Sequence, residues 1–270
     1  MNIKKFKAIT PSLRHRKILE SIAHDPFEPL VKGKVSPGFR NNTGRITVRH
    51  RGGGHKRRNR IVDLNYINSR NSEYEIIRLD YDPNRTGLLA LCRTRTRTGS
   101  TVTKPITNSH AGAGVWIGQH KYFYKLALIG QKPGDIIINK IEKKLEDISV
   151  GSEISTIEVK AGQGGKLCRS AGSYATLLGK TDKGAIIQLP SEEVKTISNQ
   201  CWATEGRVSN EKNSLTKLGK AGASRWLGRR PIVRGEAMNP IDHPHGGKTR
   251  GGRPLKNIWG KLAKWVPLKR

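Results

Sequence analysis

Apolar and polar residues alternate in short runs through the middle of the chain, and turn residues separate the runs. Alternation with a period of two predicts β-strands that bury one face. No run has the length or the 3.6-residue period of a major helix. The runs fall into two groups of five, at residues 60–66, 74–82, 87–93, 121–129 and 135–141, and at residues 153–159, 173–179, 185–189, 194–197 and 203–208. Two groups of short strands predict two small barrels.

Three further patterns lie outside these runs. Residues 45–50 alternate like a strand with one solvated face, and residues 215–226 have apolar positions at roughly helical spacing, which predicts a short helix. Gly219 and Gly222 weaken that helix. Residues 93–118 are too long for an ordinary hairpin connection and begin with Arg-Thr repeats, so we expect an extension that contacts a partner.

The two ends of the chain lack the composition of a folded core. Four prolines interrupt residues 1–43, which predicts an extended arm. Residues 234–253 contain five Gly, two Pro and four Lys or Arg but only three apolar residues. Such a stretch buries too little apolar surface to offset the entropy of ordering, so we expect a partner to supply its order.

Positive charge is concentrated at these ends. The chain of 270 residues has 51 Lys and Arg against 21 Asp and Glu, a net charge of +30. Residues 1–60 carry +13 and residues 213–270 carry +12, whereas residues 61–212 carry only +5. A nearly balanced core between two basic ends predicts a protein that binds a polyanion. A membrane surface is disfavoured, because neither an apolar run of roughly 18 residues nor a basic amphipathic helix is present in the sequence.

The cysteines and the first residues bear on compartment. Cys92, Cys168 and Cys201 stand far apart, which predicts free buried thiols in a reducing compartment. The first 17 residues have no apolar secretory core, and their basic composition fits either a transit peptide or a solvated arm.

Glycines between cations mark two candidate phosphate-binding segments. Residues 51–58 place three glycines between Arg51 and the run His55–Arg58, which fits either a flexible linker or a loop laid against phosphates, and the charge favours the loop. Gly246-Gly247, followed by Lys248, has the same character. Trp226, Trp259 and Trp265 fit base stacking or packing, and packing is favoured.

Enzymatic alternatives centre on Asp242, His243 and His245. Neighbouring residues of a proline-punctuated segment point in different directions, and no third ligand stands at a metal-binding spacing. The two GKT triplets at residues 179–181 and 247–249 lack the upstream glycine of a phosphate-binding loop. We therefore expect no enzyme, no metal and no cofactor, except magnesium held through RNA.

Several blocks of sequence resemble the universal large-subunit ribosomal protein two, in its bacterial and organellar form. These are VRGEAMNPIDHPHGG at 233–247, LGKAGASRW at 218–226, RNNTGRITVRHRGGGHK at 40–56, YDPNR at 81–85 and VKAGQGGKLCRSAG at 159–172. The blocks occur in the family's order.

The resemblance implies a mostly β fold: an OB-type barrel at 44–138 and an SH3-like barrel at 139–212, between an arm at 1–43 and an RNA-binding extension at 213–270. It implies a structural constituent of the large ribosomal subunit that binds large-subunit rRNA, contacts neighbouring ribosomal proteins and the small subunit, and supports assembly of the peptidyl-transferase region. A free translation factor or RNA chaperone, and a nucleic-acid-processing enzyme, are the alternatives. The position matching His243 is the histidine suspected of assisting peptide transfer, and we assign it a place in the RNA without a catalytic role. A phosphate-rich site would favour its protonated form.

From charge and resemblance together, we predict RNA contacts for Arg45, Arg49, His50, Arg51, Gly52, Gly53, Gly54, His55, Lys56, Arg57, Arg58, Arg60, Lys166, Arg169, Lys220, Arg225, Trp226, Arg229, Arg230, Arg234, Asn239, Asp242, His243, His245, Gly246, Gly247, Lys248, Arg250 and Arg253. Residues 93–118 and the end at Arg270, before the longer basic tail of the bacterial type, depart from the family pattern. With the Lys- and Ile-rich composition, these departures favour a mitochondrial ribosome over a plastid or bacterial one.

Overall fold

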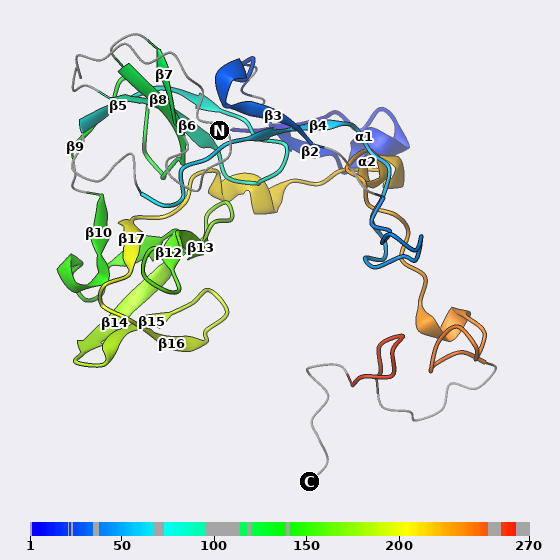
Figure 1. Cartoon of the computed structure of the whole chain (residues 1–270). Helices are drawn as coiled ribbons and strands as arrows, with labels where there is room; N and C mark the ends of the chain where they lie inside the picture. Colours follow the sequence, from blue (N-terminus) through cyan, green and yellow to red (C-terminus); the bar gives the residue numbers. More distant parts are fainter. Residues whose placement is uncertain are drawn as a thin grey trace. The chain divides into compact units, whose positions relative to one another are not determined.

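The structure is a computed structural model that describes residues 2–20, 22, 24–34, 38–66, 73–94, 114–117, 120–138, 141–247 and 255–262. Antiparallel β-sheets dominate these residues (Figure 1). Their contacts define two compact units, Met1–Val35 with Lys56–Ala221, and Ser36–His55 with Gly222–Arg270. The boundaries inferred from the sequence, at 43/44, 138/139 and 212/213, remain predictions.

The first large sheet has five strands in the order β7-β8-β6-β5-β9 (Figure 1). The strands are β5 (Glu73–Asp80), β6 (Leu89–Thr94), β7 (Gly114–Ile117), β8 (His120–Leu126) and β9 (Ile136–Ile138). Strand β6 is apolar on both faces: Ala90 and Cys92 join one buried cluster, and Leu89 and Leu91 join another. A strand with two covered faces belongs in the middle of a sheet, and β6 is the central strand.

The second large sheet has six strands in the order β10-β17-β11-β14-β15-β16. Its strands are β10 (Glu142–Lys144), β11 (Glu153–Ser155), β14 (Ala175–Thr181), β15 (Gly184–Gln188), β16 (Val194–Ile197) and β17 (Trp202–Glu205). The 3-10 turn η2 (Leu145–Asp147) follows β10, and β12 (Ile157–Glu158) pairs with β13 (Gly165–Leu167). Ile154, Leu177 and Ile187 are fully buried in its core. The predicted mostly β fold, with two successive groups of strands, is confirmed.

The N-terminal residues differ from the predicted extended arm. Strands β1 (Ile3–Lys5) and β2 (Lys17–Leu19) form an antiparallel hairpin around the one-turn helix α1 (Pro11–Arg14). Pro11 begins this helix, where its missing N–H costs nothing. Beyond the 3-10 turn η1 (Glu28–Leu30), β3 (Val31–Lys34) pairs with β4 (Arg57–Arg60). The predicted N-terminal arm therefore contains short paired strands and turns, and its longest helix, α1, has only four residues in the described part.

Two local predictions are corrected by the structure. Residues 45–50 do not form a strand: Ile46 makes an isolated bridge to Arg40, and Ile46 and Val48 are exposed. The helix expected over 215–226 is shorter, because Gly219 has φ +82°, outside the helical region. The segment instead forms the 3-10 helix η3 (Glu211–Leu215) and then α2 (Ala221–Trp226). Of the insertion at 93–118, residues 95–113 and 118–119 lie outside the described residues, and 114–117 form β7.

Candidate nucleic-acid interface

Two of the predicted RNA-binding segments cross each other within one compact unit. The Gly52 and His55 amides donate to the carbonyl oxygens of Gly228 and Trp226, with N···O distances of 3.0 and 3.1 Å. The Arg230 amide donates to the His50 carbonyl at 3.1 Å, and Arg51 and Arg229 form a backbone bridge. The crossing thus brings together two segments, far apart in sequence, that carry exposed arginines at positions 49, 51, 225, 229 and 230.

Glycine is required at this crossing because the two backbones approach closely. A Cβ atom on Gly54 would lie 2.6 Å from the Gly228 nitrogen and 2.8 Å from the Trp226 carbonyl oxygen. A Cβ on Gly228 would lie 3.0 Å from the Gly53 carbonyl oxygen. The sequence predicts that Gly52, Gly53 and Gly54 let RNA approach the backbone, whereas Gly54 makes room for the chain's own backbone at Gly228. Gly53 has no atom near its Cβ position, so RNA contact there stays a prediction.

The basic residues at positions 45–60 differ in how accessible their charged groups are to a partner. Arg45 and Arg49 are exposed, and Arg57 donates to the Pro83 carbonyl at 3.1 Å. Arg58 forms an exposed ion pair with Glu28, with 2.5 Å between nitrogen and oxygen. Arg60 is only 8% exposed, which leaves little of its side chain for a partner. Lys56 is exposed.

Lys166 and Arg169 line a groove of about 840 Å³ that has both polar and apolar walls. The turn Asn84–Thr86 contributes to its lining, so that Arg85 and Arg169 border the same space. Arg85 is ion-paired with the fully buried Asp82, with 2.7 Å between Nε and Oδ2. Sequence reasoning treated YDPNR as a turn and a family block, and so missed Arg85 as a candidate contact. The signal in the sequence is the spacing of Asp82 and Arg85, three residues apart, which allows an ion pair that fixes the position of Arg85.

Hydrogen bonds within the loop stabilise the segment that contains Asn239, Asp242, His243 and His245. The Asn239 carbonyl accepts from the amides of Asp242 and His243, at 3.0 and 3.2 Å. Gly246 donates to the His243 carbonyl at 2.8 Å, and a Cβ on Gly246 would lie 2.2 Å from the Asn239 oxygen. The 3-10 turn η4 (Gly235–Ala237) precedes the loop. The expectation that a partner supplies all the order of this stretch is thus corrected for residues 235–247.

The two histidines are engaged by backbone amides. The His245 amide donates to Nδ1 of His243 at 3.0 Å, and the Lys256 amide donates to Nε2 of His245 at 3.0 Å. Each accepting nitrogen carries no proton in this arrangement. The hypothesis that phosphate holds His243 protonated therefore requires this hydrogen bond to break. These two hydrogen bonds connect the imidazole rings to the backbone of the chain itself.

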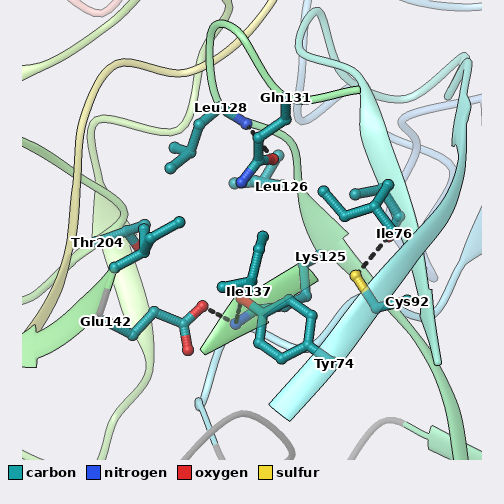
Figure 2. Close-up of a pocket in the computed structure, with 12 residues that line it drawn as sticks. Tyr74, Ile76, Cys92, Lys125, Leu126, Leu128, Gln131, Ile137, Glu142 and Thr204 are labelled. Carbon is teal, nitrogen blue, oxygen red and sulfur yellow. Dashed lines mark hydrogen bonds and ion pairs between the residues drawn. The ribbon is translucent and has the colours of Figure 1, made fainter. Parts of the chain in front are cut away.

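A buried lysine elsewhere has the environment of a reactive amine but lacks room for a substrate. Lys125 forms a buried ion pair with Glu142 and lies over the ring of Tyr74, 4.8 Å from its centroid (Figure 2). Burial lowers the pKa of Lys125 to about 8, and the charges of Cys92 and Asp63 oppose this drop. The cavity beside it has a volume of about 10 Å³, enough for one water molecule at most. This pair is a structural contact.

The structure agrees with the prediction of free buried thiols for two of the three cysteines. All three cysteines are free; Cys92 and Cys201 are buried, and Cys168 is half-buried. Burial raises the pKa of Cys92 to about 12 and that of Cys168 to about 11, which keeps both protonated near neutral pH. Within the described ranges, no group of three or more His, Cys, Asp or Glu residues could hold a metal ion, and no helix has the length and apolarity to cross a membrane.

The remaining predicted contacts are distributed over the second compact unit and its border. Arg225, Trp226, Arg234, Asn239 and Asp242 are exposed, with Trp226 57% exposed. Gly247 is exposed, and Lys220 is exposed at the border of the first unit. Lys248, Arg250 and Arg253 lie outside the described residues.

Comparisons with known proteins agree with this β fold and basic surface. The profile of the ribosomal protein L2 RNA-binding N-terminal domain matches residues 27–115, and that of the L2 C-terminal domain matches residues 141–264. The chain is 42% identical over 270 residues to large ribosomal subunit protein uL2 of Rhodospirillum centenum, covering 98% of this chain and 93% of the relative. It is 42% identical over 284 residues to uL2m of Reclinomonas americana, covering 99% and 93%, and 40% identical over 278 residues to uL2 of a Wolbachia strain, covering 98% and 93%. The chain therefore belongs to the ribosomal protein L2 family.

Proposed function

We propose that this chain is a structural constituent of the large ribosomal subunit and binds large-subunit rRNA without catalysing a reaction. The observation that carries the proposal is the crossing of residues 50–55 with residues 226–230, which gathers exposed arginines on a backbone fixed by hydrogen bonds. A net charge of +30 needs a polyanion to neutralise it, and rRNA supplies one charge per nucleotide. Membership of the L2 family supports the same function.

The RNA-binding surface in this proposal has three parts. The first is the arginine crossing with Arg45; Lys56–Arg58 contribute further cations from the other compact unit. The second is the groove with Lys166 and Arg169, to which we add Arg85. The third is the loop that contains His243, with the basic residues that follow it. Burial of Arg60 weighs against a direct contact there. We expect these parts to recognise mainly phosphates and shape, since Lys, Arg and Gly dominate them.

The position of the chain in the subunit is also a proposal. We infer that the loop at residues 235–247 lies near the peptidyl-transferase region, that neighbouring ribosomal proteins contact the two β modules, and that one face meets the small subunit. The loop's internal hydrogen bonds support this, because a preshaped loop can enter folded RNA without a large ordering cost. Magnesium would be held by the RNA and not by this chain.

We propose a mitochondrial ribosome as the compartment, with plastid and bacterial ribosomes as the alternatives. The composition and the likeness to the uL2m of Reclinomonas americana support it, while the likeness to bacterial uL2 proteins supports the bacterial alternative equally. Fractionation of the source cells, followed by detection of this chain in organellar and cytosolic ribosomes, separates the three.

Purification of particles containing the tagged chain tests the function directly. We expect the chain to sediment with large subunits in moderate salt and to co-purify with large-subunit rRNA. Release from the particles in moderate salt would indicate a translation factor or chaperone instead. Nuclease or transferase turnover by the isolated chain, lost on substitution of Asp242 and His243, would overturn the structural function.

A further inference from the structure

The first residues of the chain are docked by backbone hydrogen bonds onto a segment about 200 residues later. The hairpin pairs Ile3 with Leu19 and Lys5 with Lys17. Lys17 then pairs with Lys217: its amide donates to the Lys217 carbonyl at 2.9 Å, and the Lys217 amide donates back at 2.8 Å. Residues 2–20 and 212–220, all within one compact unit, together form what we call the N-terminal platform.

Gly219 determines how closely the two parts of the platform approach. A Cβ atom on Gly219 would lie 2.4 Å from the Ser12 carbonyl oxygen and 3.0 Å from Cβ of Arg16. Its φ of +82° is also unfavourable for any residue with a side chain. Gly219 is therefore a positioning residue for the docked hairpin.

The platform is strongly cationic. Nine Lys or Arg residues and one Glu occur in residues 2–20 and 212–220. Lys4, Lys5, Lys7, Arg14 and Lys217 are exposed, and in the described part of the chain no carboxylate pairs with any of them. Like charges held close together by backbone pairing repel each other, and a bound polyanion relieves that repulsion.

An RNA backbone fits this surface better than an acidic protein segment. The largest apolar side chain of the platform, Phe6, is covered by cations: Lys4 Nζ lies 5.8 Å and the Arg16 guanidinium carbon 5.1 Å from its ring centroid. Ile9, Leu215 and Leu218 are exposed on the platform, but they stand among nine cations and one Glu, and the core of a protein interface is depleted in charged residues. Positive charges distributed along a fixed backbone can each neutralise one of the regularly spaced phosphates of RNA.

We propose that the N-terminal platform is a preformed binding surface for the phosphate backbone of large-subunit rRNA, and that Gly219 holds its two parts in the binding arrangement. None of its hairpin residues was among the RNA contacts predicted from the sequence, which began at Arg45. The proposal rests on the proposed ribosomal function and adds a binding site to it.

Removal of charge tests the surface. In the full chain, Lys4, Lys5, Arg14 and Lys217 are replaced by Ala, and binding to a large-subunit rRNA transcript is measured against salt concentration. We expect the magnitude of the log–log salt slope to fall by about 3, at 0.7 to 0.9 per lost phosphate contact. The matched control replaces the exposed Lys132, Lys160, Lys183 and Lys195 by Ala, an equal change in charge. An equal fall in the control, or an unchanged slope in the platform variant, would overturn the proposal.

Gly219→Ala tests the positioning while it leaves every charge in place. Without RNA, trypsin should cleave after Arg16 and Lys17 several-fold faster than in the wild type, because the hairpin is released. Hydroxyl-radical footprints on the transcript should lose the same protected nucleotides as in the charge variant. Gly33→Ala, with no atom within 4 Å of its Cβ position, is the control and should match the wild type in both assays. Wild-type footprints in a Gly219→Ala protein whose hairpin is released would show that docking has no part in binding.

The ribosomal function and the RNA-binding platform can be disproved separately. If the wild-type chain does not bind the transcript or sediment with large subunits, the ribosomal function itself is wrong. If it does both, and the platform variant binds with the wild-type slope, only the platform is wrong.

Discussion

Gly54 and Gly228, which are far apart in the sequence, lie in backbone contact: a Cβ atom on Gly54 would be 2.6 Å from the Gly228 nitrogen. This contact lets two arginine-rich segments share one surface. A position can require glycine for its backbone angle or for a close approach of other atoms. Gly54 shows both requirements, whereas the neighbouring Gly53 has a positive φ but an open Cβ position.

Gly54→Ala should disrupt the crossing more than Gly53→Ala. Both substitutions place Ala at a positive φ, which costs about 1–2 kcal/mol. Only Gly54→Ala also forces a backbone clash, adding about 1–3 kcal/mol. Hydrogen exchange of the Gly52 and His55 amides measures the difference: we expect protection to be lost in Gly54→Ala and largely kept in Gly53→Ala. Equal loss in both would show that the close approach is unimportant.

Arg85 and Arg169 border the same groove, but only Arg85 pairs with a buried carboxylate. We therefore expect Arg85→Ala to lower both stability and RNA binding, and Arg169→Ala to lower RNA binding alone. Arg85→Ala leaves Asp82 buried without its ion-pair partner, so the free energy of unfolding should fall by about 3 kcal/mol. Arg169→Ala should leave it within about 0.5 kcal/mol. Each should lower the magnitude of the salt slope for rRNA binding by 0.7 to 0.9. Denaturant unfolding and filter binding measure the two effects, and an Arg169→Ala slope equal to that of the wild type would remove the groove from the interface.

His243→Ala should impair subunit assembly through the shape of its loop. The substitution removes the acceptor of the His245 amide. Gly235→Ala should have the same effect with the imidazole still present, because a Cβ on Gly235 would lie 2.4 Å from the His243 ring. Gradient profiles should show incomplete large subunits for both variants. Fully assembled His243→Ala subunits that bind substrates normally but form no peptide bonds would point to a chemical function of the imidazole.

Glu142→Gln should destabilise the fold by about 3–5 kcal/mol at pH 7, because it leaves the buried Lys125 ammonium without a counter-charge. The folded-state pKa of Lys125 is lowered to about 8, whereas an unfolded lysine titrates near 10.4. Above pH 8 the folded state therefore binds fewer protons than the unfolded state, and stability rises with pH. Without its counter-charge, Lys125 of the variant should lose its proton at a lower pH than in the wild type, so the deficit of Glu142→Gln should shrink as pH rises toward about 8 and stay constant above it. Denaturant unfolding between about pH 6 and pH 8 measures this change.

The double variant Lys125→Met with Glu142→Leu is the control for this pair. Since it leaves no unpaired charge, its stability should lie close to that of the wild type and should not vary with pH in this window. A pH-dependent deficit in the double variant would assign the effect to other groups.

Sequence reasoning succeeded where burial follows alternation. Tyr74 and Ile76 are buried on β5, as the pattern predicts, and the same holds for Leu177 on β14. Residues 45–50 alternate equally well, but the prediction of a strand there is wrong, because Ile46 and Val48 are exposed and Ile46 makes only an isolated bridge. Alternation records which side chains could be buried, while pairing depends on chain segments elsewhere.

The candidate site was predictable in its charge but not in its geometry. The density of arginine around Gly52–Gly54 pointed to this segment, and the family blocks pointed to the loop at His243. The contact of Gly54 with Gly228 depends on residues far apart in sequence, and nothing local marks it. The hairpin β1–β2 was missed because strands of three residues are too short for a periodic signal.

The pairing of Lys17 with Lys217 sets an order of events during synthesis. At roughly 5–20 residues per second, the partner strand segment emerges about 10 to 40 seconds after the hairpin has left the exit tunnel. Until then the earliest-made residues have nowhere to dock. A chain interrupted before Lys217 therefore lacks the docked hairpin and, with it, the RNA-binding surface that we propose for these residues.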